Sequence, residues 1–145
     1  YKRWDENEEG ENVYELHEEM TIIMQEDFGV FRTAENMKSG LKKLDKLKVR
    51  IDNAVLGDKS TEFNTARVEA LELDNLMEVA YATAILATNR TESRGAHSRF
   101  DHPDRDDENW LKHSVYKKEG AKISFREVNM TPKDVDPVAV KERDH

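Results

Sequence analysis

Three stretches of the chain carry hydrophobic residues at every third or fourth position, which is the spacing of an amphipathic α-helix. The first stretch has its apolar positions at Val13, Leu16, Met20, Ile23, Met24 and Phe28. Asn12 precedes this stretch as an N-cap candidate, and Gly29 follows it, where helices often end in the left-handed conformation. The pattern predicts a helix from Val13 to Phe28.

The second stretch has a single apolar stripe, and its lysines fall on the opposite side. The stripe consists of Met37, Leu41, Leu44, Leu47, Ile51 and Ala54. Thr33 is the N-cap candidate. Gly40 lies inside the stretch and weakens a helix by up to ~1 kcal/mol relative to alanine, which a buried stripe outweighs. We expect a helix from Ala34 to Val55.

The third stretch opens at Ser60 or Thr61 and is predicted to be helical from Phe63 to Asn89. Between Val79 and Ala87 it is apolar nearly all round, and such a helix is buried on most sides. A free three-helix bundle buries only one face of each helix. We therefore expect something outside the bundle to cover this helix.

These stretches predict an all-α protein, built as a three-helix antiparallel bundle of the spectrin-repeat type over residues 13–89. Residues 1–12 are acidic and contain a glycine, so we expect a linker from a catalytic part of a longer polypeptide. Residues 90–145 are predicted to form a charged loop, a small β-hairpin and an extended C-terminal tail, packed on the bundle. The hairpin pairs Ser114–Lys117 with Lys122–Arg126 across a turn at Glu119–Gly120.

The segment from Thr91 to His113 reads TESRGAHSRFDHPDRDDENWLKH and has no amphipathic period. It contains six carboxylates, four arginine or lysine residues, and three of the five histidines. A segment this charged gains little from hydrophobic burial, so ion pairs and hydrogen bonds must hold it in place. The helices before it are interpreted as the scaffold that presents it.

Composition excludes several classes of function. The chain has 145 residues and a net charge of −8, so it lacks the basic stripe that binds nucleic acid or anionic membranes. It has no cysteine, which excludes disulfides, thiolate metal sites and cysteine nucleophiles. No apolar run approaches the ~20 residues of a membrane span.

The histidines suggest a metal site or a serine–histidine pair. His97, His102 and His113 lie among aspartates, but their spacing fits no standard metal-ligand pattern. Ser93 lies close to His97 in the sequence, but no nucleophile elbow surrounds it. We therefore assign no metal ligand and no nucleophile to this segment.

Three consecutive acids, Asp106, Asp107 and Glu108, suggest the paired carboxylates of a hydrolase. Acids after a proline are also preferred in the first turn of a helix, where they face its positive end. We favour the helix start, with Trp110 and Leu111 buried against the bundle. No catalytic residue is assigned.

Arg94, Gly95, His97 and Arg99 are the candidates for a docking site. Gly95 permits a positive φ or a close approach by another surface, and the two guanidinium groups suit carboxylates or phosphates. The alternative from these residues alone is an internal ion-pair network with the neighbouring aspartates.

Several segments together resemble a known family. Residues 91–114 (TESRGAHSRFDHPDRDDENWLKHS) look like the C-terminal segment of succinate dehydrogenase flavoprotein subunits, as do MQEDFGVFR, STEFNTARVEALELDNLMEVAYATA and VNMTPK. Fumarate reductase flavoproteins and L-aspartate oxidase share SRG-type motifs at this place. The final PVAVKERDH departs from the family, whose members commonly end in a basic and aromatic tail.

The resemblance implies a full subunit that oxidises succinate to fumarate with covalent FAD and passes electrons to an iron–sulfur subunit and quinone. It would lie on the cytoplasmic face of the bacterial inner membrane, or on the matrix side in mitochondria, and meet the membrane anchor subunits indirectly. None of the family's catalytic, FAD-binding or substrate-gripping motifs maps onto a residue here, so the isolated chain is expected to be inactive and without cofactor.

The partners that the resemblance implies are the subunit's own FAD-binding and capping domains. It favours docking as the role of Arg94, Gly95, His97 and Arg99. We also expect a non-physiological homodimer of the isolated chain through the surface that it would otherwise bury. Rival hypotheses are the equivalent domain of fumarate reductase or L-aspartate oxidase, a free-standing acidic helical interaction module, and a metal-dependent hydrolase.

Overall fold

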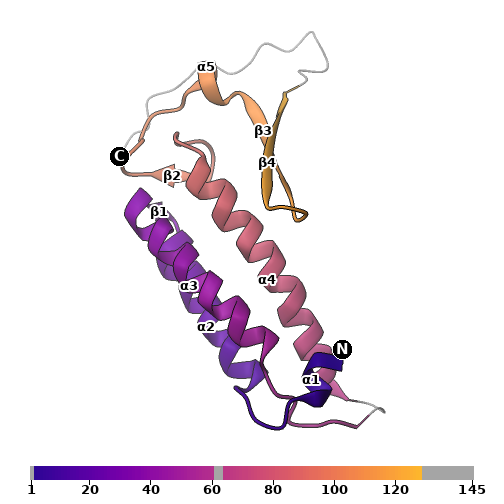
Figure 1. Cartoon of the computed structure of the whole chain (residues 1–145). Helices are drawn as coiled ribbons and strands as arrows, with labels where there is room; N and C mark the ends of the chain where they lie inside the picture. Colours follow the sequence, from indigo (N-terminus) through magenta and orange to yellow (C-terminus); the bar gives the residue numbers. More distant parts are fainter. Residues whose placement is uncertain (1, 61–63, 129–145) are drawn as a thin grey trace.

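The computed structural model describes residues 2–60 and 64–128, and most of the regular structure among them is helical (Figure 1). The helices are α1 (Lys2–Glu6), α2 (Val13–Phe28), α3 (Ala34–Asp52), α4 (Thr65–Asn89) and α5 (Asp107–Trp110). The strands are β1 (Phe31–Arg32), β2 (Ser98–Arg99), β3 (Lys112–Lys117) and β4 (Lys122–Glu127). The expected tail lies outside the described residues.

Helices α2, α3 and α4 form the body of the molecule and lie side by side, each in contact with the other two (Figure 1). Their buried apolar positions form one core, which confirms the predicted helical bundle. The core residues of these helices include Leu16, Met20, Ile23, Met37, Leu44, Leu47, Ile51, Ala70, Leu73 and Met77. The core residues of α2 and α3 lie at the positions of the two predicted stripes, so the periodicity identified the buried faces of these two helices correctly.

The predicted N-caps of the first two bundle helices are confirmed. The Asn12 side chain accepts a hydrogen bond from the Tyr14 backbone N–H, and the Thr33 hydroxyl accepts one from that of Asn36. The predicted start of α4 is wrong, because its N-cap is Asn64, whose side chain accepts from the Arg67 N–H at 2.9 Å.

The Asn64 side-chain amide also donates to the Ser60 carbonyl. Ser60, one of the two predicted starts of this helix, therefore lies in the loop before α4 and accepts a hydrogen bond from the actual N-cap. Thr61 and Phe63, which the sequence placed at this start, lie outside the described residues. The predicted end of the second helix is also wrong, because α3 stops at Asp52 and not at Val55.

Two glycines let backbone and side chains approach closely at one end of the bundle. Gly29 has φ −66°, so the predicted left-handed conformation is wrong; a Cβ there would lie 2.4 Å from the Gln25 carbonyl oxygen. A Cβ on Gly40 would lie 2.5 Å from Cε2 of Phe28. Gly40 therefore lowers the helix propensity of α3 but allows α2 to pack closely on it.

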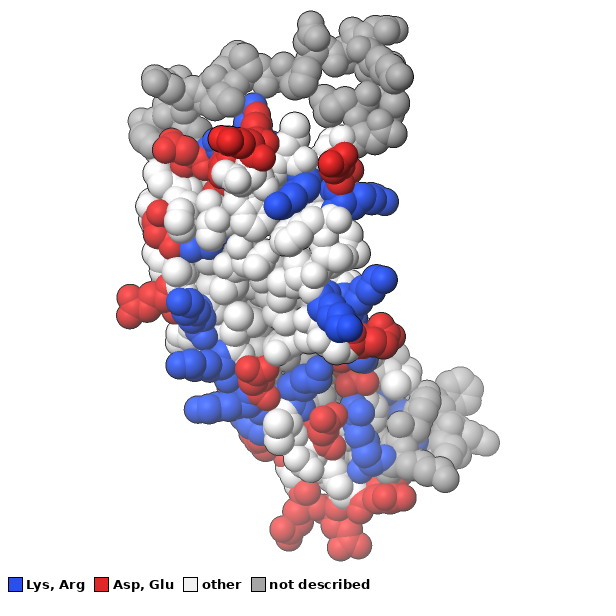
Figure 2. All heavy atoms as spheres, turned by 45° about the horizontal axis from the view of Figure 1, so that its top comes forward, with Lys and Arg blue, Asp and Glu red and all other residues white. Residues whose placement is uncertain are grey.

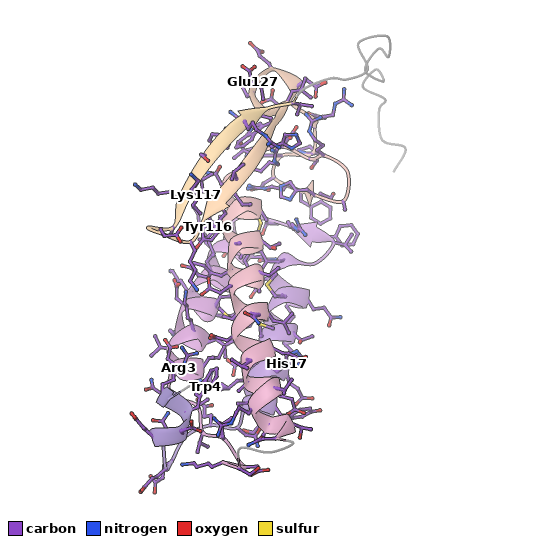
Figure 3. All side chains as sticks on the ribbon, turned by 90° about the vertical axis from the view of Figure 1, so that its right-hand side faces the viewer. Arg3, Trp4, His17, Tyr116, Lys117 and Glu127 are labelled. Carbon is purple, nitrogen blue, oxygen red and sulfur yellow. The ribbon has the colours of Figure 1, made fainter. Side chains whose placement is uncertain are left out.

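The N-terminal residues are more than the linker that the sequence predicted. Trp4 in α1 is 1% exposed and belongs to the core, and its indole N–H donates to the Ile51 carbonyl at 2.9 Å. Arg3 lies over the Trp4 ring and pairs with Asp52 and Asp74, so α1 is bonded to both α3 and α4 (Figure 3).

The predicted hairpin is confirmed and is slightly longer than expected, with Lys112 paired to Glu127 at its open end. It contacts the C-terminal half of α4, and Lys118 at its tip pairs with Glu78 at 2.9 Å. The chain's own hairpin thus covers part of the second apolar face of α4. Val79 on that helix remains 65% exposed.

A two-stranded parallel sheet that the sequence did not predict joins two distant loops. In this sheet Phe31 pairs with Ser98 and Arg32 with Arg99. The connection between α2 and α3 is thereby fixed to the charged segment that follows α4.

Candidate functional site

The charged segment that follows α4 is organised around the buried carboxylate of Glu92, whose side chain is 0% exposed. It accepts hydrogen bonds from the guanidinium of Arg90 at 2.5 Å, from Nε of Arg94 at 2.8 Å and from the backbone N–H of Asp106 at 2.9 Å. Burial by itself would raise the pKa of this carboxyl. The hydrogen bonds from Arg94, Asp106 and Arg90 outweigh burial, so the pKa is lowered and Glu92 stays ionised.

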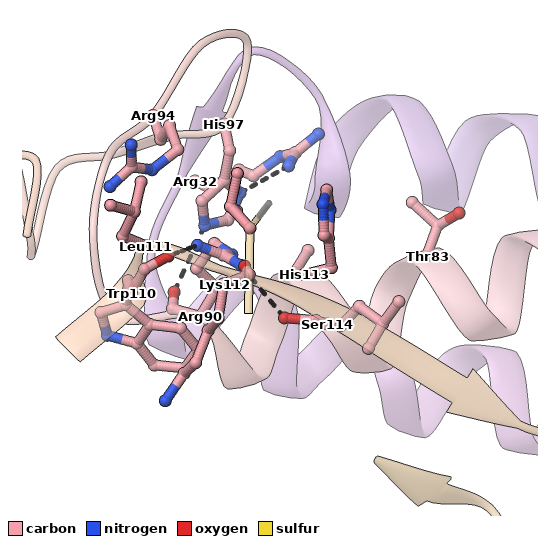
Figure 4. A pocket seen from close by; sticks show the side chains of 13 residues that line it. Arg32, Thr83, Arg90, Arg94, His97, Trp110, Leu111, Lys112, His113 and Ser114 are labelled. Carbon is pink, nitrogen blue, oxygen red and sulfur yellow. Dashed lines mark hydrogen bonds between the residues drawn. The ribbon is translucent and has the colours of Figure 1, made fainter. Parts of the chain in front are cut away.

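Arg90 links the end of α4 to the hairpin. Its guanidinium donates to the Trp110 carbonyl at 3.0 Å, to the Lys112 carbonyl at 2.7 Å and to the Ser114 hydroxyl at 3.1 Å. It also lies 4.9 Å from the centroid of the Trp110 ring (Figure 4). Together with its ion pair to Glu92, these bonds give both terminal nitrogens of Arg90 two acceptors each within the chain.

Arg94 bridges Glu92 and the start of α5. It donates to Asp107 at 2.5 Å, and Arg105 donates to the other oxygen of the same carboxylate at 2.6 Å. The Arg94 guanidinium is the main cause, followed by Arg105, of the lowered pKa of Asp107. Asp106 is the N-cap of α5, so the predicted helix start at these acids is confirmed. Leu111 is 43% exposed, so its predicted burial against the bundle is wrong.

Arg99 points into the protein and is 2% exposed. It forms an ion pair with Asp101 and donates to the carbonyl of Arg90 at 3.0 Å. The Arg99 guanidinium lowers the pKa of Asp101 to about 2. Because Asp101 also accepts from the backbone N–H of Ala34 at 3.1 Å, this pair connects the charged segment to the first turn of α3.

His97 is held between cations. Its Nδ1 lies 2.8 Å from Nη1 of Arg32, and its Nε2 lies 3.3 Å from the Arg90 carbonyl (Figure 4). A guanidinium can only donate, so Nδ1 accepts and the ring proton is on Nε2. Burial, together with the charges of Arg32, Arg99 and Arg90, lowers the pKa of His97, so it is neutral at pH 7.

Arg94 and His97 flank a tight turn that projects from the segment. The backbone N–H and carbonyl of each bond to those of the other, at 2.8 and 3.0 Å. Gly95 has φ +57°, which is the reason for a glycine at the first central position of such a turn. A Cβ on Gly95 would meet nothing within 4 Å, so the space beside the turn is open.

A cavity of about 620 Å³ opens between the end of α4, this turn and β3 (Figure 4). Its apolar lining comes mainly from Leu86, Ala87, Trp110 and Leu111. The charged side chains that line it are all cationic and come from arginine and lysine residues. On the face shown in Figure 2, Lys, Arg, Asp and Glu surround a broad uncharged area.

Ser93 and His97 of the charged segment both make contacts within the chain. Ser93 donates to the His102 carbonyl at 2.7 Å and accepts from the Arg99 N–H, while His97 pairs with Arg32, so Ser93 and His97 do not form a pair. Within residues 2–60 and 64–128, no group of histidines and carboxylates could hold a metal ion. The segment is instead held together by internal ion pairs and presents the Arg94–His97 turn.

The structure thus separates the four predicted docking residues. Gly95 is exposed and Arg94 and His97 are half-buried at the turn, whereas Arg99 lies beneath them. The internal ion-pair network, which the residues alone left open as the alternative, holds for Arg94 and Arg99. Sequence reasoning missed Glu92, Arg90 and Arg32, because nothing in a mixed-charge segment marks which carboxylate becomes buried.

Residues 17–145 match the family model described as fumarate reductase flavoprotein C-terminal region. The chain belongs to this flavoprotein C-terminal family. The succinate dehydrogenase flavoprotein subunit of Coxiella burnetii is 57% identical over 143 residues, which cover 99% of this chain and 24% of that protein.

Other members of the family and one solved structure agree. The fumarate reductase flavoprotein subunit of a Serratia species is 40% identical over 83% of this chain and 21% of that protein. A structure of E. coli quinol fumarate reductase FrdA, solved as a point mutant, superimposes with a TM-score of 0.86 at 34% identity, covering 95% of this chain and 24% of that one. The chain therefore spans about a quarter of the length of these relatives.

Among the described residues, no helix is both long enough and apolar enough to cross a lipid bilayer.

Proposed function

We propose that this chain is the helical C-terminal domain of a succinate dehydrogenase flavoprotein subunit. The observation that carries the proposal is the 57% identity to the Coxiella burnetii subunit along almost the whole chain. The complete subunit would oxidise succinate to fumarate with FAD and pass the electrons to an iron–sulfur subunit and quinone. It would be a peripheral subunit on the cytoplasmic face of the membrane and would meet the membrane anchors indirectly.

A fumarate reductase flavoprotein is the second candidate. The description of the family model and the TM-score of 0.86 to the E. coli fumarate reductase chain support it. The higher identity to the Coxiella burnetii succinate dehydrogenase, 57% against 40% for the Serratia fumarate reductase, favours the first candidate.

Within such a subunit the role of this chain is architectural. Its described residues form two-stranded sheets and not the strand–helix–strand unit that binds dinucleotides, so they do not fit FAD. FAD and the catalytic groups therefore belong to the flavoprotein part that precedes this region in the relatives. The bundle, which we infer to be antiparallel and of the spectrin-repeat type, packs against that part.

The Arg94–His97 turn is the docking element of this proposal. Open space beside Gly95 and the half-buried side chains of Arg94 and His97 support this role. Arg99 contributes from below, since its ion pair with Asp101 holds the turn on α3. The iron–sulfur subunit then meets a flavoprotein whose shape this domain stabilises.

The test uses a chimera in which this chain replaces the matched quarter of the Coxiella burnetii subunit. We expect the chimera to retain FAD and to reduce an artificial electron acceptor with succinate, and the same subunit truncated before the matched quarter to lose both. If the truncated subunit keeps FAD and oxidises succinate as fast as the chimera, the architectural role is wrong.

A further inference from the structure

The loop between α2 and α3 and the residue after β2 together expose an apolar surface, formed by Val30, Phe31 and Phe100. These side chains are 69%, 63% and 64% exposed, respectively. The two phenylalanine rings are stacked, with centroids 5.1 Å apart and an angle of 13° between their planes. Each ring thus shields one face of the other and leaves its remaining surface to solvent.

The backbone beneath this aromatic pair is fixed. Phe31 and Ser98 pair in the parallel sheet, and the Phe100 N–H donates to the Arg32 carbonyl at 3.0 Å. The Arg32 side chain folds back onto the carbonyls of Phe28 and Gly29 at 3.1 and 2.9 Å, and onto His97. The rings are therefore presented by an ordered support, which lowers the entropy lost when a partner covers them.

An exposed aromatic side chain alone needs no explanation, since much of any protein surface is apolar. Two stacked rings beside a third exposed apolar residue differ from that background. Aromatic side chains on a rigid support are the usual centres of binding energy at protein interfaces. Phe100 also follows the Arg94–His97 turn, which is the proposed docking element, by three residues, and Arg32, next to Phe31, bonds to His97 of that turn.

We propose that Val30, Phe31 and Phe100 form the apolar centre of the surface on which the preceding flavoprotein part of the same subunit docks. The proposal rests on the proposed function. The occupant is identified by the length of the relatives, of which this chain spans 24%, and by the bond of Arg32, next to Phe31, to His97 of the docking turn. The matching surface on the flavoprotein part must be apolar, because the exposed atoms at this centre belong to aliphatic and aromatic side chains.

The test compares backbone hydrogen exchange in the isolated chain and in the chimera. We expect the amides of Phe31 and Phe100 to exchange at least ~10-fold more slowly in the chimera, because docking excludes water and suppresses local opening. The double variant Phe31→Ser with Phe100→Ser should lose this protection in the chimera. Ile22→Ser, which replaces an apolar side chain 53% exposed on α2, is the matched control and should retain it.

Thermal unfolding of the isolated chain shows whether the double variant still folds. Its Tm should fall by no more than the Tm of the Ile22→Ser control falls. If the Tm of the serine double variant falls further, the double variant Phe31→Leu with Phe100→Leu is used in its place. It keeps apolar area but removes the ring stack, so it should lose part of the protection of these two amides in the chimera.

The outcomes of the exchange experiment distinguish failure of this proposal from failure of the proposed function. If Gly95 and His97 become protected in the chimera but Phe31 and Phe100 do not, the apolar surface is not the docking centre, while the proposed function stands. If no residue of the chain gains protection, both fail. If the protection of Phe31 and Phe100 depends on concentration in the chimera as well as in the isolated chain, a second copy is the occupant and this proposal is overturned. Concentration dependence in the isolated chain alone is the expected non-physiological homodimer, and it agrees with the proposal.

Discussion

Replacement of Glu92 by glutamine tests whether one buried carboxylate organises the charged segment. The substitution keeps the size of the side chain and removes its charge. Arg90 and Arg94 would then share a neutral amide, and the amide N–H group would face guanidinium N–H groups that can only donate. The backbone N–H of Asp106 would compete for the single remaining oxygen.

The free energy lost in Glu92→Gln depends on how deeply its partners Arg90 and Arg94 are buried. Removing one member of a buried ion pair costs ~3–5 kcal/mol, because it leaves the other charge unpaired. The Arg90 and Arg94 side chains are 15% and 30% exposed, so both keep some contact with water. We therefore take the lower end, ~3 kcal/mol, which corresponds to a ~100-fold change in an opening equilibrium.

Hydrogen exchange measures that opening directly. The amides of Arg94, Arg99 and Phe100 are hydrogen-bonded within the segment or to β1, and they should exchange ~100-fold faster in Glu92→Gln. Amides in the core of α3 should be unaffected. Glu108→Gln, an exposed acid in the same segment, is the control. Exchange within about twofold of wild type in both variants would refute the central role of Glu92.

Three further predictions concern stability. Trp4→Ala should lower the free energy of unfolding by ~3–5 kcal/mol in urea, because it empties a buried site; a loss near zero would mean that the N-terminal residues are a linker after all. Because Arg99 lowers the pKa of Asp101 from its ordinary 3.8 to about 2, their pair stabilises the segment above pH 4, and that contribution should disappear as the pH falls from 4 to 2. Near-ultraviolet circular dichroism should follow this loss, and Asp101→Asn should abolish the dependence. Gly95→Ala should lower the free energy of unfolding, measured in urea, by ~1–2 kcal/mol because the φ of Gly95 is positive. Gly57→Ala, at an open site of ordinary φ, should lower it by less. Equal losses in the two variants would contradict a turn that requires glycine at position 95.

The local parts of the fold were predictable. The stripes of α2 and α3 and the caps at Asn12 and Thr33 depend on residues within one or two turns of each other, so periodicity and hydrogen-bonding preferences were sufficient. The resemblance to the flavoprotein family was likewise available from the long run of residues after α4.

The rest depended on contacts between residues that are distant in the sequence. Trp4 is a single apolar residue in an acidic segment, and only its burial against Ile51 shows its role. The pairing of Phe31 with Ser98 involves strands of two residues, which have no sequence signature. In the sequence, nothing distinguishes Glu92 from the other carboxylates of its segment. Its role appears only in the fold, where Arg90 at the end of α4 and the backbone of Asp106 at the start of α5 both bond to it.

We have proposed that the Arg94–His97 turn and its supporting ion pairs hold this domain against a larger flavoprotein part. The most direct measurement is a crystal structure of the chimera. We expect Arg94, His97 or the backbone of Gly95 to lie within about 4 Å of the flavoprotein part, with the hydrogen bonds of Glu92 intact. A turn that faces solvent, with the flavoprotein part packed elsewhere on the bundle, would contradict it.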